Sequence, residues 1–205
     1  MPIPSDTRQH PQPGRDDLAR ARSILLWILS VAVGVLIATG IALFFLYRPT
    51  TRQAWPGILT ESYDWDVRVS SALRLIHRLA AWLAVLTAVA TGVALALRRP
   101  ATGSRWTGPV LGAGLPITTL AAFFTGLLLP WDQLALWAVT VGSNVRGYRI
   151  VFDPVVRFVL IGGVEISRHT LIRWLLVHML LLGPAVVALV VLGWRRKRAD
   201  VAGGQ

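Results

Sequence analysis

The apolar run TLIRWLLVHMLLLGPAVVALVVLGW, at residues 170–194, decides the fold of this chain. It exceeds the roughly 20 helical residues that cross about 30 Å of hydrocarbon, and Arg173 and His178 are its only ionisable side chains. Three further runs of the same kind lie at residues 23–47, 72–97 and 107–129. We therefore expect an all-α, integral membrane four-helix bundle over residues 23–195.

The overall composition agrees with a membrane protein and excludes several chemistries. Apolar residues make up 54% of the chain and charged residues 15%, whereas soluble domains carry about 25% charged residues. The chain has no cysteine, which excludes disulfides, thiolate metal sites, cysteine-ligated iron–sulfur clusters and covalent c-type haem. The net charge of +11 does not indicate nucleic-acid binding, because the arginines gather at the ends of apolar runs rather than in one stripe.

The basic residues also predict an orientation. Four spans place three basic segments on one side, and the positive-inside rule assigns that side to the cytoplasm. We expect a multi-pass protein of the cell (inner, or cytoplasmic) membrane with both termini cytoplasmic. Residues 1–22, which are polar and rich in proline, are expected to form a disordered cytoplasmic tail, and residues 196–205 a second tail. A signal peptide is not expected, because the first apolar run is too long. The basic residues of this side are Arg8, Arg15, Arg20, Arg22, Arg98, Arg99, Arg105, Arg195, Arg196, Lys197 and Arg198.

Two histidines are the candidate functional residues. His77 and His178 are each the only histidine of their apolar run, and the alternation of the spans brings both near the extracytoplasmic face. A histidine in lipid is costly unless it has a partner. Two imidazoles at matching depth can supply both protein ligands of a haem iron. We therefore predict one bis-histidine haem b.

Other uses of these histidines stay open at this point. Each imidazole could instead form a hydrogen bond with a neighbouring helix. Both could serve a proton relay, although such relays usually include intramembrane acids. A metal ion without a porphyrin would need more ligands than two imidazoles.

Small and basic residues near the histidines suit a haem. Gly40 and Gly126 lie in neighbouring spans toward the same face, where a flat macrocycle needs space against the backbone. Arg74 and Arg173 lie about one turn from the two histidines and could pair with the propionates. The alternative is that the glycines let helices pack closely and that the arginines extend toward the membrane surface.

The stretch GLLLPWDQLALWAVTVGSN, at residues 126–144, resembles a segment of the cytochrome b family of quinol-oxidising cytochrome bc complexes. Shorter resemblances are IATG at residues 37–40, RLIH at residues 74–77, and TLIR followed by His178. The similarity covers about residues 25–195 and corresponds to the N-terminal, haem-bearing half of the family. The matching residues of the long stretch are Pro130, Trp131, Gln133, Trp137, Thr140, Val141 and Asn144.

The resemblance implies a role for each candidate residue. His77 and His178 match the axial ligands of the haem nearer the extracytoplasmic face. Residues 130–144 match a surface helix and the loop at residues 155–168 matches a short helix before the last span, so the resemblance implies short extracytoplasmic surface helices between the third and fourth spans. Arg74 and Arg173 match arginines near that haem, while Gly40 and Gly126 match glycines against its edge. The edge of a quinone pocket would be formed by Pro130, Trp131, Asp132 and Trp137.

The departures from the family pattern are equally informative. The family has a second ligand pair fourteen residues after the first, or about 21 Å of helix rise, for a second haem. Here Thr91 and Leu192 occupy those positions, and Leu26 replaces a glycine of that level. The second haem is therefore predicted to be absent. Asp132 replaces a glycine of the family; it could accept a proton from quinol or favour the start of a surface helix.

The resemblance implies a membrane b-type cytochrome subunit that carries electrons between quinone and an extracytoplasmic partner. The partner could be a C-terminal cytochrome b half, an iron–sulfur protein or a c-type cytochrome. Chemistry on a substrate would then belong to the complex rather than to this chain alone. Two alternatives remain: a haem-free membrane anchor or assembly subunit, and a transporter or channel. The last is disfavoured because no intramembrane acid and no inverted repeat is apparent.

Overall fold

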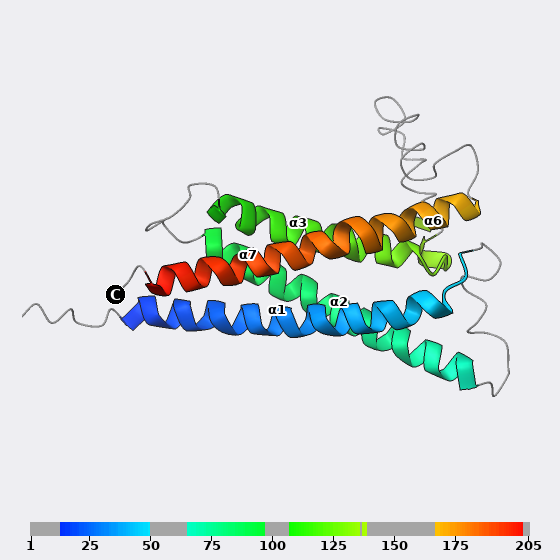
Figure 1. The fold of residues 1–205 in the computed structure, drawn as a ribbon, viewed down its shortest axis with the longest axis horizontal. Coiled ribbons are helices and arrows are strands. Elements are labelled where there is room, and N and C mark those ends of the chain that lie inside the picture. Colours follow the sequence, from blue (N-terminus) through cyan, green and yellow to red (C-terminus); the bar gives the residue numbers. More distant parts are fainter. Residues whose placement is uncertain (1–12, 50–64, 97–106, 136, 139–166, 203–205) are drawn as a thin grey trace, which may run out of the picture.

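The computed structural model describes residues 13–49, 65–96, 107–135, 137–138 and 167–202, and these ranges are all-α (Figure 1). Four of the helices are long and apolar enough to cross a membrane: Arg20–Leu46, Arg68–Leu95, Gly108–Leu128 and Arg168–Ala199. The predictions of an all-α bundle and of a multi-pass membrane protein are confirmed. Of the predicted surface helices, residues 133–135 and 137–138 are described and helical; the rest lies outside the described residues.

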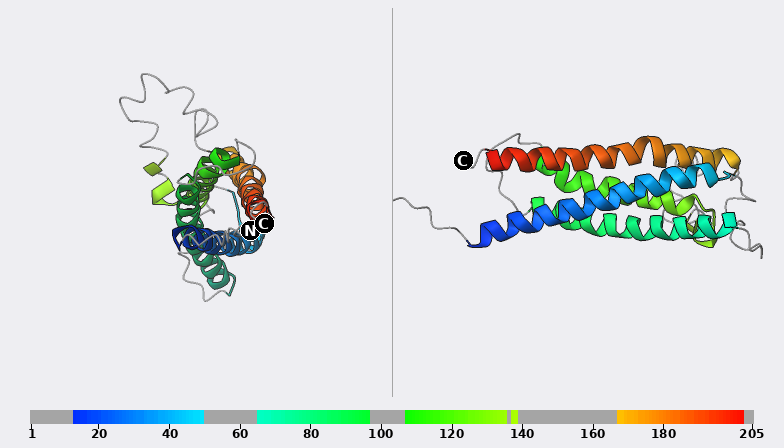
Figure 2. Two further views of the ribbon diagram at one scale, coloured as in Figure 1. Left: turned by 90° about the vertical axis from the view of Figure 1, so that its left-hand side faces the viewer. Right: turned by 60° about the horizontal axis from the view of Figure 1, so that its bottom comes forward.

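The helices run alternately up and down and form a ring. They are α1 (Pro13–Leu46), α2 (Trp65–Ala96), α3 (Thr107–Leu128) and a final helix composed of α6 (Arg168–Leu176), η2 (Val177–Leu182) and α7 (Gly183–Ala202). Each packs on its neighbour in the chain, and α7 closes the ring against α1 (Figure 2). We call the end with Pro13 and Ala202 the terminal end, and the end with Leu46 and Arg168 the distal end.

Two helices begin earlier than the apolar runs predicted. The first begins at Pro13 rather than at residue 23, and the second at Trp65 rather than at residue 72. Proline is favoured at the first position of a helix, and no further proline or glycine follows Gly14 until Gly34. Helix formation therefore continues into polar sequence, whereas the apolar run marks only the part that lipid can cover. Residues 1–12 of the predicted tail lie outside the described residues.

The final helix widens around His178. Residues Val177–Leu182 form a π-helix, in which the Gly183 N–H donates to the carbonyl of His178 five residues earlier. Pro184 follows directly; it has no N–H to donate, and its ring crowds the carbonyl four residues before it. The wider turn relieves that conflict. His178 therefore sits on a π-helical turn, which a sequence pattern based on 3.6 residues per turn does not anticipate.

The packed core lies in the half of the bundle near the terminal end. Its buried cluster comprises Leu29, Ala32, Val33, Ala84, Ala88, Leu115, Val186 and Val190. Close backbone contact joins α2 to α3 in this half: a Cβ at Gly92 would lie 2.5 Å from the Gly112 carbonyl oxygen. In a regular helix this carbonyl would accept a hydrogen bond from the N–H of residue 116, but Pro116 has no N–H. The tight contact therefore covers an oxygen without a helical partner.

Candidate cofactor site

The two candidate histidines face each other across the bundle. His77 on α2 and His178 on η2 have ring centroids 6.4 Å apart and ring planes inclined by 57°. Metal–imidazole bonds are about 2 Å long and the ring centre lies about 1 Å behind the nitrogen, so two imidazoles on opposite sides of one metal ion have centres roughly 6 Å apart. The pair therefore fits a single metal ion held between the rings. The predicted meeting of these two side chains is what the structure describes.

A threonine hydroxyl contacts the Nδ1 nitrogen of His77. The Thr39 hydroxyl oxygen on α1 lies 2.8 Å from Nδ1 of His77, and the same hydroxyl is 2.7 Å from the Val35 carbonyl, to which it can donate. Because a hydroxyl has one proton, both contacts are hydrogen bonds at once when the hydroxyl donates to the carbonyl and its oxygen accepts from Nδ1–H. In a neutral imidazole with a proton on Nδ1, Nε2 carries the free lone pair. Nε2 is therefore the nitrogen available to a metal.

The second histidine is held in the same way from α3. The Thr125 hydroxyl oxygen lies 3.0 Å from Nδ1 of His178 and donates to the Ala122 carbonyl at 2.9 Å. Sequence reasoning missed both threonines. Each of them directly precedes a candidate glycine, but Thr91 also precedes a glycine, so this pattern does not single out the two threonines.

The two candidate glycines lie against the imidazole rings. A Cβ at Gly40 would be 3.4 Å from Cε1 of His77, and a Cβ at Gly126 would be 3.1 Å from Cε1 of His178. The second distance is tighter than ordinary contact, so an alanine there would displace the ring. Because the glycines have no side chain, each imidazole can lie close to the adjacent helix. The same positions could also leave space for a flat macrocycle.

The candidate arginines occupy different surroundings. Arg74 is half-buried, and its Nη1 is buried with no hydrogen-bond partner among the described residues. Leaving a charged donor buried and unmatched is costly, so this position suits an anionic group. Arg173 is exposed and lies on α6, near the distal end. Of the two, Arg74 is therefore the better placed to meet a carboxylate within the bundle.

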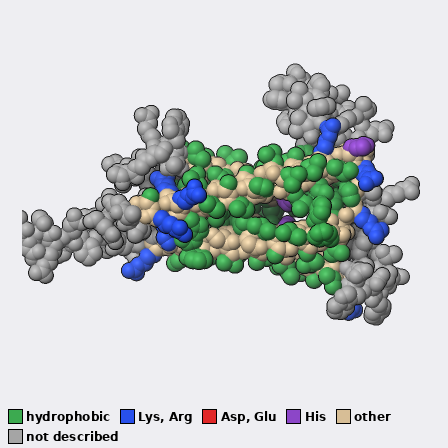
Figure 3. Space-filling model, viewed as in Figure 1, with side chains coloured by type: hydrophobic (Ala, Val, Ile, Leu, Met, Phe, Trp, Pro, Cys, Tyr) green, Lys and Arg blue, Asp and Glu red, His purple; other side chains and the backbone are tan. Residues whose placement is uncertain are grey.

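The histidines lie in a hollow of an otherwise apolar surface. Figure 3 shows their side chains (purple) between hydrophobic side chains, nearer the distal end, while Lys and Arg gather at the two ends of the molecule. Both rings are only half-buried, although they lie between the spans. Both rings are therefore partly accessible through this hollow.

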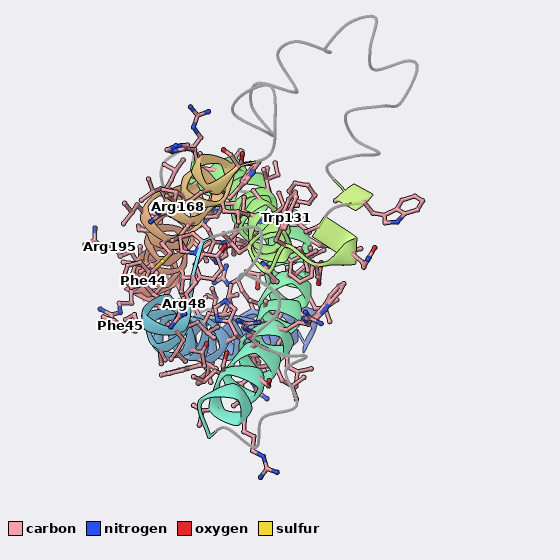
Figure 4. All side chains as sticks on the ribbon, turned by 90° about the vertical axis from the view of Figure 1, so that its right-hand side faces the viewer. Phe44, Phe45, Arg48, Trp131, Arg168 and Arg195 are labelled. Atoms are coloured by element: carbon pink, nitrogen blue, oxygen red, sulfur yellow. The ribbon has the colours of Figure 1, made fainter. Side chains whose placement is uncertain are left out.

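The residues predicted to edge a quinone pocket lie at the distal end of α3. Trp131 adopts a positive φ of 52°, a conformation rarely taken by bulky residues, and packs with Leu128, Ala135 and Trp174. Figure 4 shows Trp131 at this end, with Phe44 and Phe45 on the outer side of α1. Pro130 is half-buried and Trp137 is exposed. These residues are gathered at one rim, whereas residues 139–144 and 155–166 of the same predicted region lie outside the described residues.

Asp132 begins the short helix that follows Trp131. Its Oδ1 accepts a hydrogen bond of 2.9 Å from the Ala135 backbone N–H, the usual contact of an acid that caps a helix N-terminus. This supports the interpretation of Asp132 as a helix start.

The level of the missing second ligand pair is filled by side chains. Thr91 is fully buried and donates to the Thr87 carbonyl at 2.6 Å. Leu26 is buried, and a Cβ at Gly193 would lie 3.2 Å from its Cδ2. One turn away, the Trp194 indole N–H donates to the Ser30 hydroxyl at 2.9 Å. At this level of the terminal half, the side chains of neighbouring helices therefore pack directly against one another.

Comparison with known proteins agrees with these features. A family model described as cytochrome b/b6/petB matches residues 23–194. Cytochrome b6 of Heliomicrobium gestii is 32% identical over 155 residues, covering 72% of this chain and 68% of the relative. Cytochrome b6 of Porphyra purpurea is 31% identical over 169 residues, covering 80% and 75%. Cytochrome b6 of Heliobacterium mobile is 26% identical over 193 residues, covering 92% and 87%.

Proposed function

The chain belongs to the cytochrome b family, and we propose that it is a membrane subunit that carries electrons between quinone and a partner protein through one bis-histidine haem b. The facing pair His77 and His178, with ring centroids 6.4 Å apart, carries this proposal. A bound haem b supplies one-electron redox chemistry, with a potential that its ligands and surroundings tune. The relatives named above are cytochromes b6, which supports a place in a membrane redox complex.

Several residues of the chain would hold this haem, each in a different way. The imidazoles of His77 and His178 offer Nε2 as ligand atoms, because threonine hydroxyls occupy Nδ1. Arg74 would meet a propionate with its buried Nη1, and exposed Arg173 would act at the mouth of the site. Gly40 and Gly126 would keep the rings seated against α1 and α3.

The packing of the terminal half supports a single haem. Neither Thr91 nor Leu192 has the imidazole that the first level offers, and buried Leu26 adds bulk at the same level. A subunit with one haem in the distal half lacks a relay station for the remaining width of the membrane. Electrons would therefore enter and leave on the distal side, which we assign to the extracytoplasmic face of the cytoplasmic membrane.

Quinone would approach the rim formed by Pro130, Trp131, Asp132 and Trp137. A protein partner would dock on the same side: a C-terminal cytochrome b half, an iron–sulfur protein or a c-type cytochrome. Asp132 is held by its hydrogen bond to the Ala135 N–H, so we give it a role in shaping this rim rather than in accepting a proton.

The test is the haem content of the purified chain. The protein is expressed in a haem-competent host, purified in mild detergent, and analysed by reduced-minus-oxidised spectroscopy and by the ratio of extracted haem to protein. One non-covalent haem b per chain, low-spin in both oxidation states, is expected. A ratio of two would contradict the single site. A colourless protein would favour the alternative of a haem-free anchor or assembly subunit.

A further inference from the structure

We propose that Thr39 and Thr125 are positioning residues that set the ring orientation and the ligand strength of His77 and His178. This inference rests on the proposed function, because it concerns how the two imidazoles would meet a haem iron. It assigns a role to two side chains on α1 and α3, the two helices that supply no ligand. Each histidine would then be controlled from the helix beside its own.

The threonine oxygens are fixed points. Thr39 is 8% exposed and Thr125 is 4% exposed, and each hydroxyl is tied to a carbonyl of its own helix turn. With the hydroxyl proton on that carbonyl, each oxygen presents a lone pair toward Nδ1 of its histidine. An Nδ1–H that meets this lone pair cannot rotate away without leaving a buried donor unmatched, which costs about 1–3 kcal/mol.

A glycine lies beside each ring at the neighbouring atom. A Cβ added at Gly40 would lie 3.4 Å from Cε1 of His77, and one at Gly126 would lie 3.1 Å from Cε1 of His178. Each glycine directly follows its threonine, so the threonine contacts Nδ1 while the missing side chain leaves space for Cε1. The two ring planes are inclined by 57° in this arrangement. The Thr-Gly pairs at residues 39–40 and 125–126 therefore position the two imidazole rings in the same way.

The hydrogen bond also affects the strength of the ligand. A partner on the far ring nitrogen orients a metal-binding histidine and raises its basicity. In this chain the partner is a neutral hydroxyl that itself donates to a carbonyl, and such chains of hydrogen bonds reinforce one another. Removing the hydroxyl would weaken electron donation by the imidazole. Weaker donation favours the reduced iron, so the midpoint potential should rise.

Other threonines of the bundle provide matched controls. Thr119 on α3 is buried and donates to the Leu115 carbonyl at 2.7 Å, and Thr87 on α2 is buried and donates to the Leu83 carbonyl at 2.7 Å. Neither contacts a histidine among the described residues. Like Thr39 and Thr125, each has a buried hydroxyl that donates to a carbonyl of its own helix, but it lacks the contact with a histidine Nδ1. A change seen at Thr39 or Thr125 but absent at Thr119 and Thr87 therefore reports on the imidazole.

The experiment compares Thr39→Val and Thr125→Val with Thr119→Val and Thr87→Val in the haem-loaded protein. Valine keeps the shape and removes the acceptor. Potentiometric titration should show an upward shift of midpoint potential in the first two variants only, and electron paramagnetic resonance of the ferric form should show altered g values as the rings reorient. Thr39→Ser and Thr125→Ser should restore both properties.

The outcomes separate this inference from the proposed function. If wild-type protein binds haem but all four valine variants keep its potential and g values, the positioning role is wrong and the haem proposal stands. If wild-type protein binds no haem, the proposed function itself fails. If Thr39→Val or Thr125→Val loses haem while the serine and control variants retain it, the positioning role is supported. Equal loss in the control variants would overturn it.

Discussion

The distal and terminal halves of the bundle use the same four helices and differ in what lies between them. In the terminal half, the side chains of all four helices meet in one buried cluster around Leu29, Ala88 and Leu115. In the distal half, two half-buried imidazoles face each other at 6.4 Å. Dense packing without voids is the usual condition of a protein interior. The haem of the proposed function would complete the packing of the distal half.

The two levels differ in the side chains that the helices place there. At the distal level, glycine and threonine lie next to the histidines on both sides. At the terminal level, Leu26 and Thr91 are buried where the family places a glycine and a ligand. Under the proposed function, larger and non-ligating side chains would close the second level within the same arrangement of four helices. Stability and cofactor binding should consequently be separable by mutation.

The largest effect is expected from His77→Ala and His178→Ala. Either change removes one of two protein ligands, and haem content should fall by a factor of about 10–100 or more, since even weaker perturbations around ligands have effects of that size. The helical content should remain, because neither histidine belongs to the buried cluster. Haem-to-protein ratio and circular dichroism measure the two effects.

His169→Ala is the control for this pair. His169 is exposed at the start of α6, so its loss should leave haem content unchanged. Retention of haem in His77→Ala and His178→Ala together would contradict the site.

The opposite pattern is expected from Leu115→Ala in the terminal half. Leu115 is fully buried, and removing such a side chain leaves a cavity that costs about 2–5 kcal/mol. The unfolding midpoint in detergent should fall, while the folded fraction keeps its haem and spectrum. Leu120→Ala, on the same helix but at a position that is 46% exposed, should change the midpoint little. Equal effects at both positions would mean that the terminal half is not a tightly packed core.

A smaller effect is expected from Gly92→Ala, which tests the closeness of α2 and α3. The new Cβ would lie 2.5 Å from the Gly112 oxygen and 2.8 Å from Cγ of Pro116, so the helices must separate. Overpacking of this kind costs about 1–3 kcal/mol. Gly34→Ala is the matched control, because nothing lies within 4 Å of its added Cβ. Its higher helix propensity, about 1 kcal/mol, should make that variant as stable as wild type or more stable.

The sequence predicted the parts of this arrangement that depend on long patterns. The four spans followed from length and hydropathy, and the meeting of His77 and His178 followed from the alternation of the spans. Helix ends were less predictable, because α1 continues to Pro13 through residues that favour a helix without being apolar. The widened turn at His178 depends on how Pro184 is accommodated, and a proline alone does not determine whether a helix kinks or widens.

Thr39 and Thr125 show the limit most clearly. Five threonines of the membrane-spanning segments donate to a carbonyl four residues earlier, and a sixth threonine of these segments is buried as well. The sequence does not distinguish two of them, since the contact with a histidine depends on how neighbouring helices are rotated. The positive φ of Trp131 is a further case, because the sequence there resembles a family segment without revealing its backbone conformation.

The smallest effect is expected from Tyr47→Phe, at the rim of the distal half. The Tyr47 hydroxyl donates to the Leu129 carbonyl at 2.7 Å and so joins the ends of α1 and α3 outside the membrane-spanning segments. Losing this hydrogen bond should cost about 0.5–1.5 kcal/mol. Haem content should be preserved, because this hydrogen bond connects the ends of α1 and α3 and does not involve the imidazoles. Thermal unfolding in detergent at neutral pH measures the difference.

The same residue predicts a pH dependence at high pH. Burial raises the pKa of Tyr47 to about 12 from its ordinary value of 10.0, while the charge of Arg74 acts to lower it. The folded state then holds the phenol proton more tightly than the unfolded state, so stability is lost as pH rises from about 10 toward 12. Tyr47→Phe has no proton to lose and should show a shallower decline over this range. Parallel curves for the two proteins would mean that folding does not raise the pKa of the Tyr47 hydroxyl.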